Sequence, residues 1–188
     1  PRFDDPGVRN VDIDYQDEVF RTSPIQNYTL GVSGGGQQSK FLVSLNYMNQ
    51  QGIVVNNDFQ RYSVRINSEF SITENLRFGQ NLNLAFTDQT PVIRSGGRSL
   101  FEHVTKFAPY LVPRDPTNPG GFNGPDQIDN NDAENPVRVL LLGDRTRENF
   151  KALGNLYGEW EIIEGLSLRS SIGIDYANGR NFDFVPSF

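Results

Sequence analysis

The chain has 188 residues, a formal net charge of -6 at pH 7 and no cysteine. This charge balance provides no basic patch for binding nucleic acid, and the lack of cysteine excludes disulfide frameworks and thiolate metal sites. Hydrophobic residues make up 36% of the chain, and no apolar run approaches the ~18 residues that a membrane-spanning helix needs. A membrane β-barrel remains compatible with this composition, because one side of each barrel strand faces a polar lumen.

Residues 1–25 are predicted to form a segment with one short helix. Asp14 can cap this helix, which runs through residues 18–21. The chain begins without Met and without the charged, apolar and small-residue pattern of a signal peptide. Its last residues read as continuing chain, and we therefore expect the sequence to be a piece of a longer protein.

Six later segments alternate apolar and polar residues with a period of two, which predicts strands with one apolar and one polar face. The predicted strands are 26–33, 40–48, 59–70, 76–87, 150–162 and 166–176. We predict an all-β fold in which they form an antiparallel up-and-down meander. Residues 26–87 hold four strands in two hairpins, and residues 150–188 hold two strands and the start of a further loop.

A soluble β-sandwich and a membrane β-barrel differ in what the two faces of the sheet contact. In a soluble sandwich the apolar faces of two sheets meet each other, whereas in a membrane barrel the apolar face meets lipid and the polar face lines the lumen. The alternation alone is compatible with both. For a barrel, the predicted lumen-facing residues are Arg61, Arg65, Glu69, Arg77, Asn81, Asn83, Glu159, Arg169 and Asp175.

The connections between the strands alternate in length. The short links are 34–39, 71–75 and 163–165. Longer links at 49–58 and 88–149 lie between them. Outer-membrane barrels have short periplasmic turns and longer extracellular loops. This parity favours a barrel and predicts that the longer links and residues 1–25 lie on the extracellular side. Aromatic residues near the strand ends also suit the two headgroup layers of a membrane, although a sandwich would bury aromatic residues as well.

Segment 88–149 is predicted to be a long extracellular loop, because it is rich in Gly, Pro, Asn and Asp. It carries one predicted helix, in which Ser99 and Glu102 form a capping box and Pro109 ends the helix. A second helical turn is predicted at residues 137–142.

The loop contains the remaining candidate site residues. Phe107, Tyr110 and Phe122 could stack on sugar rings of a substrate or pack within the loop. His103, the sole histidine, is predicted to be a surface residue without a catalytic role. An acidic run could attract Ca²⁺ but lacks the EF-hand pattern, and we favour a solvated loop; its members are Asp126, Asp129, Asp132 and Glu134. We predict no catalytic residue, metal site or cofactor, and hence no enzyme.

Several segments together resemble the SusC/RagA type of TonB-linked outer-membrane proteins. Residues 14–22 (DYQDEVFRT) are similar to the family segment DWQDEIFRT, with Tyr15 in place of the usual Trp. Residues 26–35, 45–54 and 58–67 follow in the family's order and spacing, and they resemble the patterns QNHNLSVSGG, YxNQEGIV and DFKRYSLRLN. The resemblance covers roughly residues 12–87, and the later strands fit a family hairpin.

The resemblance implies an importer embedded in outer-membrane lipid. Family members have a barrel of about 22 strands filled by an N-terminal plug, work with a SusD-like surface lipoprotein and draw energy through TonB. Their substrates are typically oligosaccharides or peptides. Six strands cannot close such a barrel, so we expect this chain to supply part of it, with TonB contacting the plug region. The alternative is a soluble or surface β-sandwich module that binds glycans.

Overall fold

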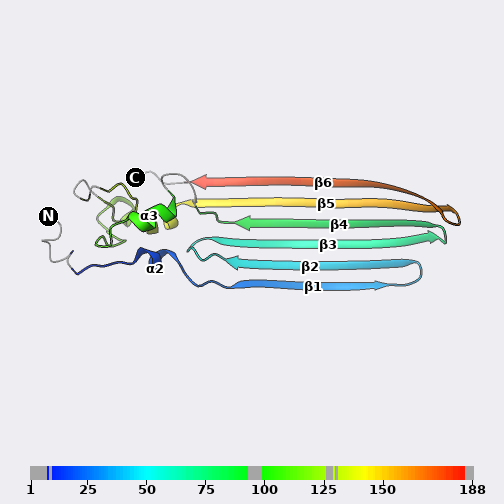
Figure 1. The fold of residues 1–188 in the computed structure, drawn as a ribbon, viewed down its shortest axis with the longest axis horizontal. Helices are drawn as coiled ribbons and strands as arrows, with labels where there is room; N and C mark the ends of the chain where they lie inside the picture. The colour runs from blue at the N-terminus through cyan, green and yellow to red at the C-terminus, as the bar shows by residue number, and fades with distance from the viewer. Residues whose placement is uncertain (1–7, 9, 93–98, 126–128, 130, 185–188) are drawn as a thin grey trace.

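The computed structural model describes residues 8, 10–92, 99–125, 129 and 131–184. Its main feature is one six-stranded antiparallel sheet in which every strand pairs with its neighbours in the sequence (Figure 1). The strands are β1 (Ile25–Gly35), β2 (Ser39–Gln51), β3 (Asp58–Thr73), β4 (Leu76–Gln89), β5 (Asp144–Ile163) and β6 (Leu166–Phe184). The predicted all-β meander is thereby confirmed.

The last two strands are longer than their alternation predicts. β5 begins at Asp144 rather than at residue 150, and β6 continues to Phe184. The added parts pair with each other, as in the ion pair between Arg145 and Asp183 at 3.2 Å. Residues 144–149 are polar on both faces, so no apolar alternation marks them as a strand in the sequence.

The short links all lie at the end of the sheet that is remote from the helices (Figure 1). Two of them leave only two residues between strands, 74–75 and 164–165, and each follows a break in the pairing register on the preceding strand. Gly165 has a φ of 82°, a left-handed conformation that glycine adopts without steric cost. The predicted alternation of short and long links is therefore present in the structure.

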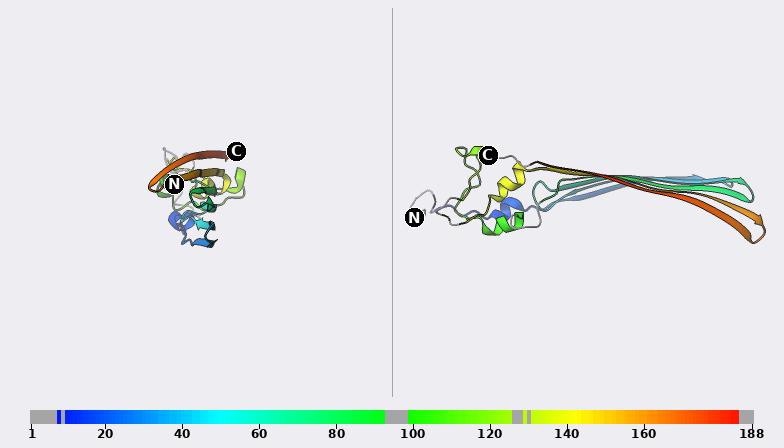
Figure 2. Two further views of the ribbon diagram at one scale, coloured as in Figure 1. Left: turned by 90° about the vertical axis from the view of Figure 1, so that its right-hand side faces the viewer. Right: turned by 90° about the horizontal axis from the view of Figure 1, so that it is seen from above.

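Short α-helices gather at the opposite end of the sheet, three of them within the described residues (Figure 2). They are α2 (Tyr15–Val19), α3 (Leu100–Lys106) and α4 (Pro136–Leu142), and a 3-10 turn, η2, spans Pro119–Gly121. Asp14 and Ser99 cap α2 and α3 as predicted, by accepting hydrogen bonds from the backbone N–H groups of Gln16 and Glu102. None of the described helices is long and apolar enough to cross a membrane.

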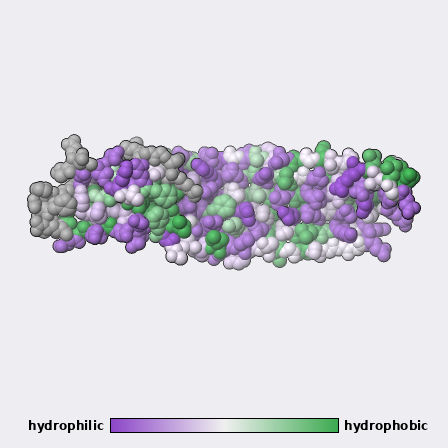
Figure 3. Space-filling view, viewed as in Figure 1, coloured by the Kyte–Doolittle hydropathy of each residue, from purple (hydrophilic) through white to green (hydrophobic). Residues whose placement is uncertain are grey.

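We call these helices and the loops between them the loop cap (residues 10–24, 52–57 and 90–143, as far as they are described). The loop cap contains the buried hydrophobic core. Its members are Tyr15, Val19, Val54, Leu100, Val104, Phe107, Leu111, Phe122, Ala133, Val137 and Leu140. In the space-filling view, the surface of this end shows a hydrophobic patch beside hydrophilic residues (Figure 3). Residues from three separate parts of the sequence thus fold into one small packed unit.

The strands contribute no buried hydrophobic side chain to that core within the described residues. Ile172, in the middle of β6, is 71% exposed, and Leu30 on β1 is 65% exposed. A sandwich would bury such residues between two sheets, but the described residues form a single sheet. The alternative prediction of a β-sandwich is therefore wrong in its architecture.

Candidate functional site

The nine predicted lumen residues all lie on one face of the sheet, which we call the polar face. Residues directly opposite each other in an antiparallel pair share a face, and the register of the sheet connects the strands in this way. One row across the sheet joins Arg65, Asn83, Leu153 and Asp175. The structure thus brings the predicted residues onto a common surface, although Leu153 interrupts its polarity.

A charged cluster occupies the polar face near the short turns. Glu159 accepts hydrogen bonds from Arg77 at 2.6 Å and from Arg169 at 3.4 Å. The three residues are directly opposite one another on β4, β5 and β6. Both arginine side chains are about half exposed, so solvent screens these ion pairs. The ion pairs instead hold one negative and two positive charges in fixed relative positions across three strands.

Tyr157 belongs to the same cluster but was missed in the sequence prediction. Its hydroxyl donates a hydrogen bond to Oε2 of Glu69 at 2.8 Å, across β4. The guanidinium carbon of Arg169 lies 4.1 Å above the centre of its ring, a cation–π contact. We expected aromatic residues on the apolar face. Tyr157, however, is directly opposite Gly79, which in turn is opposite Glu69, so it lies on the polar face.

The other half of the polar face carries a smaller amide network. Asn46 donates from Nδ2 to Asn27 Oδ1 at 2.7 Å and to Thr29 Oγ1 at 2.9 Å, and its Oδ1 accepts from Arg61 at 3.4 Å. Lys151 lies 3.9 Å from Asp175. Asn81, Asn83 and Arg65 make no side-chain hydrogen bond within the described part of the chain. The face can therefore bind polar groups through many donors and acceptors, and no group of His, Cys, Asp and Glu suited to a metal occurs among the described residues.

The opposite, apolar face carries two rows of aromatic residues. Five residues paired in succession from β1 to β5 form the cap-side row: Tyr28, Tyr47, Tyr62, Phe86 and Phe150. Near the turns, Phe41, Phe70, Phe78 and Trp160 form the turn-side row. Phe78 and Phe86 are separated by roughly 26 Å of strand at about 3.3 Å per residue. At the tilt of about 40° that barrel strands have, this corresponds to roughly 20 Å along the membrane normal, within the apolar band of about 25 Å that aromatic girdles border in outer-membrane barrels.

The loop candidates differ in their accessibility. Phe107 and Phe122 are only 4% and 5% exposed in the core of the loop cap, and Arg114 lies 4.1 Å above the ring of Phe122. Their burial supports packing within the loop over stacking on a substrate. Tyr110 is half-buried, and its hydroxyl donates to Asp129 at 2.7 Å.

The prediction that His103 is a surface residue is wrong. Its side chain is 3% exposed, because the face of α3 that carries Leu100 and Val104 packs into the cap. Nδ1 accepts a hydrogen bond from the backbone N–H of Glu134 at 3.1 Å, which ties α3 to the segment before α4. Of the acidic run, Asp126 lies outside the described residues.

The chain is similar in sequence to known TonB-dependent receptors. No family model matches the chain. It is 27% identical over 186 residues to TonB-dependent receptor P3 of Formosa agariphila, covering 93% of this chain and 18% of that protein. It is 25% identical over 211 residues to TonB-dependent receptor SusC of Bacteroides thetaiotaomicron, covering 98% of this chain and 20% of SusC.

A solved structure gives the same result. The structure of the RagAB peptide importer in the open-open state superposes with a TM-score of 0.72 at 26% identity, covering 93% of this chain and 20% of the matched chain. The chain thus spans about a fifth of the length of the proteins that it matches. TonB-dependent receptors are transporters of the outer membrane and not enzymes. In sequence and in fold, the chain is similar to a barrel segment of SusC/RagA-type TonB-dependent receptors.

Proposed function

We propose that this segment forms part of the wall of an importer that brings oligosaccharides or peptides across the outer membrane with a SusD-like surface lipoprotein. The observation that carries the proposal is the division of one sheet into two faces. Charged and amide side chains collect on the polar face, and exposed aliphatic side chains between two aromatic rows collect on the other. If both faces of the sheet were in water, the apolar face would be an exposed apolar patch far larger than those of soluble proteins.

The edges of the sheet support the same proposal. Among the described strands, β1 and β6 each pair on one side only. Open sheet edges do not occur in the hydrocarbon region of a membrane, because their N–H and C=O groups would have no partner. Further strands of the same receptor would pair with both edges and close the barrel around the polar face.

The two ends of the sheet then acquire different roles. The loop cap carries the long connections and would face the cell exterior, where its surface, including Tyr110, is placed to contact the lipoprotein partner or substrate. The short turns would lie in the periplasm. In this arrangement the nine predicted residues and Tyr157 border the lumen, where they hydrogen-bond the plug or the passing substrate, and TonB acts through the plug region.

Cysteine labelling in living cells tests the assignment of the two faces. The chain contains no cysteine, so Arg65→Cys and Ile66→Cys, on consecutive residues of β3, would each introduce one thiol into this segment of the receptor. A water-soluble maleimide should label Arg65→Cys and leave Ile66→Cys unlabelled. Equal labelling of both positions would exclude a lipid-facing apolar side.

Uptake measurements test the transport itself. Cells with and without the receptor, each with and without TonB, would receive a fluorescent mixture of oligosaccharides or a fluorescent mixture of peptides. Accumulation of one mixture should require both the receptor and TonB, and it should fall when the neighbouring lipoprotein is deleted. Accumulation that is independent of the receptor for both mixtures would refute the proposed substrate classes.

A further inference from the structure

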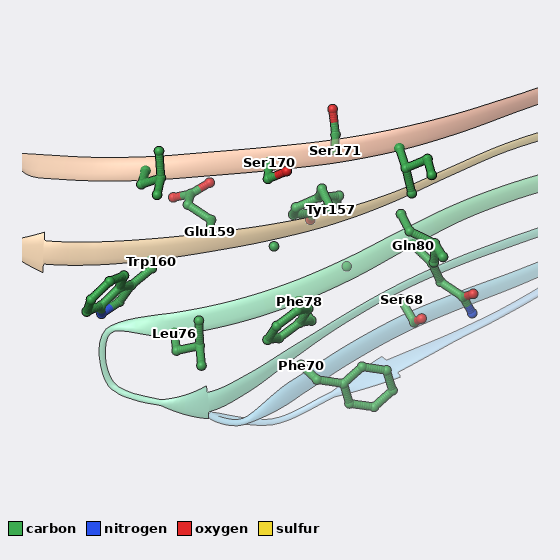
Figure 4. Close-up of a pocket in the computed structure, with 15 residues that line it drawn as sticks. Ser68, Phe70, Leu76, Phe78, Gln80, Tyr157, Glu159, Trp160, Ser170 and Ser171 are labelled. Carbon is green, nitrogen blue, oxygen red and sulfur yellow. The ribbon is translucent and has the colours of Figure 1, made fainter.

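The apolar face contains a groove near the short turns, between β4 and β6 (Figure 4). Its volume is about 730 Å³, and it is lined by Gly158 on β5, over which the Phe78 ring lies. The apolar side chains around it include Leu76, Phe78, Leu156, Trp160, Leu168 and Ile172. A second hollow of about 490 Å³, over Gly154, shares Leu156 and Ile172 with the first. The two hollows therefore follow β5 toward the middle of the apolar face.

Polar side chains also line this groove, among them Ser68, Gln80 and Ser170. Ser68 and Gln80 are directly opposite each other on β3 and β4, and both line the groove (Figure 4). The hydroxyl oxygen of Ser68 is buried and has no hydrogen-bond partner within the described residues. A buried hydroxyl without a partner is unfavourable. Rotation of the Ser68 side chain about χ1 would turn this hydroxyl into the groove, where a ligand could supply the missing hydrogen-bond acceptor.

The depth of these two residues indicates which ligand fits. Ser68 and Gln80 lie two residues from Phe70 and Phe78 toward the middle of the strands, which is roughly 7 Å along each strand. Phe70, Phe78 and Trp160 belong to the turn-side aromatic row, and such rows mark the headgroup level of a membrane. An acceptor just below the headgroups, continuous with a hydrocarbon tail, is the ester carbonyl of a phospholipid.

We propose that the groove binds one acyl chain of a phospholipid, whose ester carbonyl accepts hydrogen bonds from Ser68 and Gln80. The proposal rests on the proposed function, which places the apolar face in lipid and the short turns at the periplasmic leaflet. The acyl chain lies against the Phe78 ring beside Gly158 and continues toward Gly154, and Trp160 borders the mouth. This lipid is held in place, unlike the lipids that exchange over the rest of the apolar face.

Native mass spectrometry of the complete receptor in detergent can test this site. The probe is palmitoyl-oleoyl phosphatidylethanolamine, added at increasing concentration. Ser170 is exposed on β6 directly opposite Gly158 and lines the groove, so Ser170→Phe would fill it. Ala152→Phe adds a similar volume to the same face of β5 outside the groove, and it is the matched control. We expect one tightly retained phospholipid in the wild type and in Ala152→Phe, and at least fivefold lower retention in Ser170→Phe.

Ser68→Ala separates the polar contact from the shape of the groove. It removes the hydroxyl without filling space, and retention should fall severalfold while the barrel stays folded, as judged by heat-modifiable migration in electrophoresis. A folded wild-type barrel that retains no phospholipid, or equal retention in wild type, Ser170→Phe and Ser68→Ala, would overturn the lipid site and leave the proposed function intact. A wild-type receptor that forms no barrel would overturn both.

Discussion

Tyr157 lies across Gly79, its cross-strand partner on β4, and so reaches Glu69 on β3. A Cβ atom on Gly79 would lie 2.2 Å from Cζ of the tyrosine ring, far inside contact distance. The absence of a side chain at residue 79 is therefore what lets one aromatic ring connect three strands on the polar face. Arg169, stacked on the same ring, extends the connection to a fourth strand.

Replacing Gly79 by alanine should displace this ring and break its hydrogen bond to Glu69. We expect the free energy of unfolding of the receptor to fall by about 1–3 kcal/mol, since both hydrogen-bonding groups lose their partner. Urea-unfolding curves of the refolded receptor would measure the change. Gly31→Ala is the matched control, because Gly31 lies on the same face in β1 and a Cβ there meets no atom within 4 Å.

Tyr157→Phe removes the hydroxyl and keeps the ring, so its effect on the free energy of unfolding measures the hydrogen bond to Glu69 alone. If the ring and the glycine act together, Gly79→Ala should cost much less in a Tyr157→Ala background than in the wild type. Equal costs of Gly79→Ala in both backgrounds would mean that the ring does not depend on Gly79.

A charge placed on the apolar face should be far more disruptive than the same charge on the polar face. Leu82 and Asn81 are consecutive residues of β4 that point to opposite faces, and both lie near the middle of the strand. Leu82→Arg should destabilise the receptor by about 2–4 kcal/mol, as for a charge at the centre of a membrane barrel. Asn81→Arg should cost less than about 1 kcal/mol. Similar losses in refolding assays with lipid vesicles would contradict the assignment of the faces.

The sequence allowed the meander, its faces and the helix starts to be predicted, because each depends on local patterns. Alternation with a period of two marks the part of a strand that separates two environments, and cap residues such as Asp14 and Ser99 mark helix starts. Beyond the cap-side row at Phe150, β5 is polar on both faces, so its extension to Asp144 left no such pattern. The pairing of the strands determines that extension.

Other features depend on contacts between distant residues. His103 is buried because α3 packs beside the segment that carries Glu134, and its neighbours in the sequence do not indicate this. Tyr157 acquires its role from Glu69 and Gly79, which only the register of β3, β4 and β5 brings together. The burial of Phe107 and Phe122 likewise requires the cap to fold as one unit.

Asn135 is expected to be the most sensitive polar residue of the loop cap. It is 1% exposed, and its Nδ2 donates to the carbonyls of Pro113 at 2.8 Å and Asn123 at 2.9 Å, while its Oδ1 caps α4. Asn135→Asp keeps the shape but turns the two donations into contacts between oxygen atoms. We expect a loss of about 3 kcal/mol in the stability of the cap, from a buried group without its partners.

Hydrogen–deuterium exchange of residues 111–123 in the intact receptor would detect this loss. Exchange there should accelerate by roughly a hundredfold or more, at about 1.4 kcal/mol per factor of ten, while the strands remain protected. Asn131→Asp, at a half-buried residue of the same cap that donates one side-chain hydrogen bond, to the carbonyl of Lys106, is the control and should change the exchange rate less. Unchanged exchange in Asn135→Asp would show that the cap does not depend on this side chain.

Tyr15 is the residue at which this chain departs from the resembling family segment, where Trp is usual. Its ring packs edge-on against Phe107 at 4.8 Å, and its buried hydroxyl donates to the carbonyl of Leu111 at 2.5 Å. Trp also carries an N–H donor on a large ring, whereas Phe carries none. Tyr15→Phe should therefore lower the stability of the cap by about 1–3 kcal/mol, and Tyr15→Trp should lower it less.

The alkaline pH range provides a second test of the buried hydroxyl. Burial, with a smaller contribution from the charge of Glu18, raises the pKa of the Tyr15 phenol far above its usual value. In the unfolded cap the phenol ionises near pH 10, while in the folded cap it keeps its proton. The stabilising contribution of Tyr15 is therefore complete below about pH 10 and is lost as the pH rises toward the raised pKa of the folded state.

The advantage of the wild type over Tyr15→Phe should accordingly shrink by about 1 kcal/mol between pH 9 and pH 11. The urea midpoint of the cap can be followed with a fluorophore attached to Thr105→Cys, an exposed position on α3. Tyr15→Phe carries no ionisable group at residue 15, so it corrects for every other group that titrates in this range. A difference between the two proteins that stays constant from pH 9 to pH 11 would mean that the Tyr15 hydroxyl is reached by water, and that the cap is less tightly packed around α2 than the structure indicates.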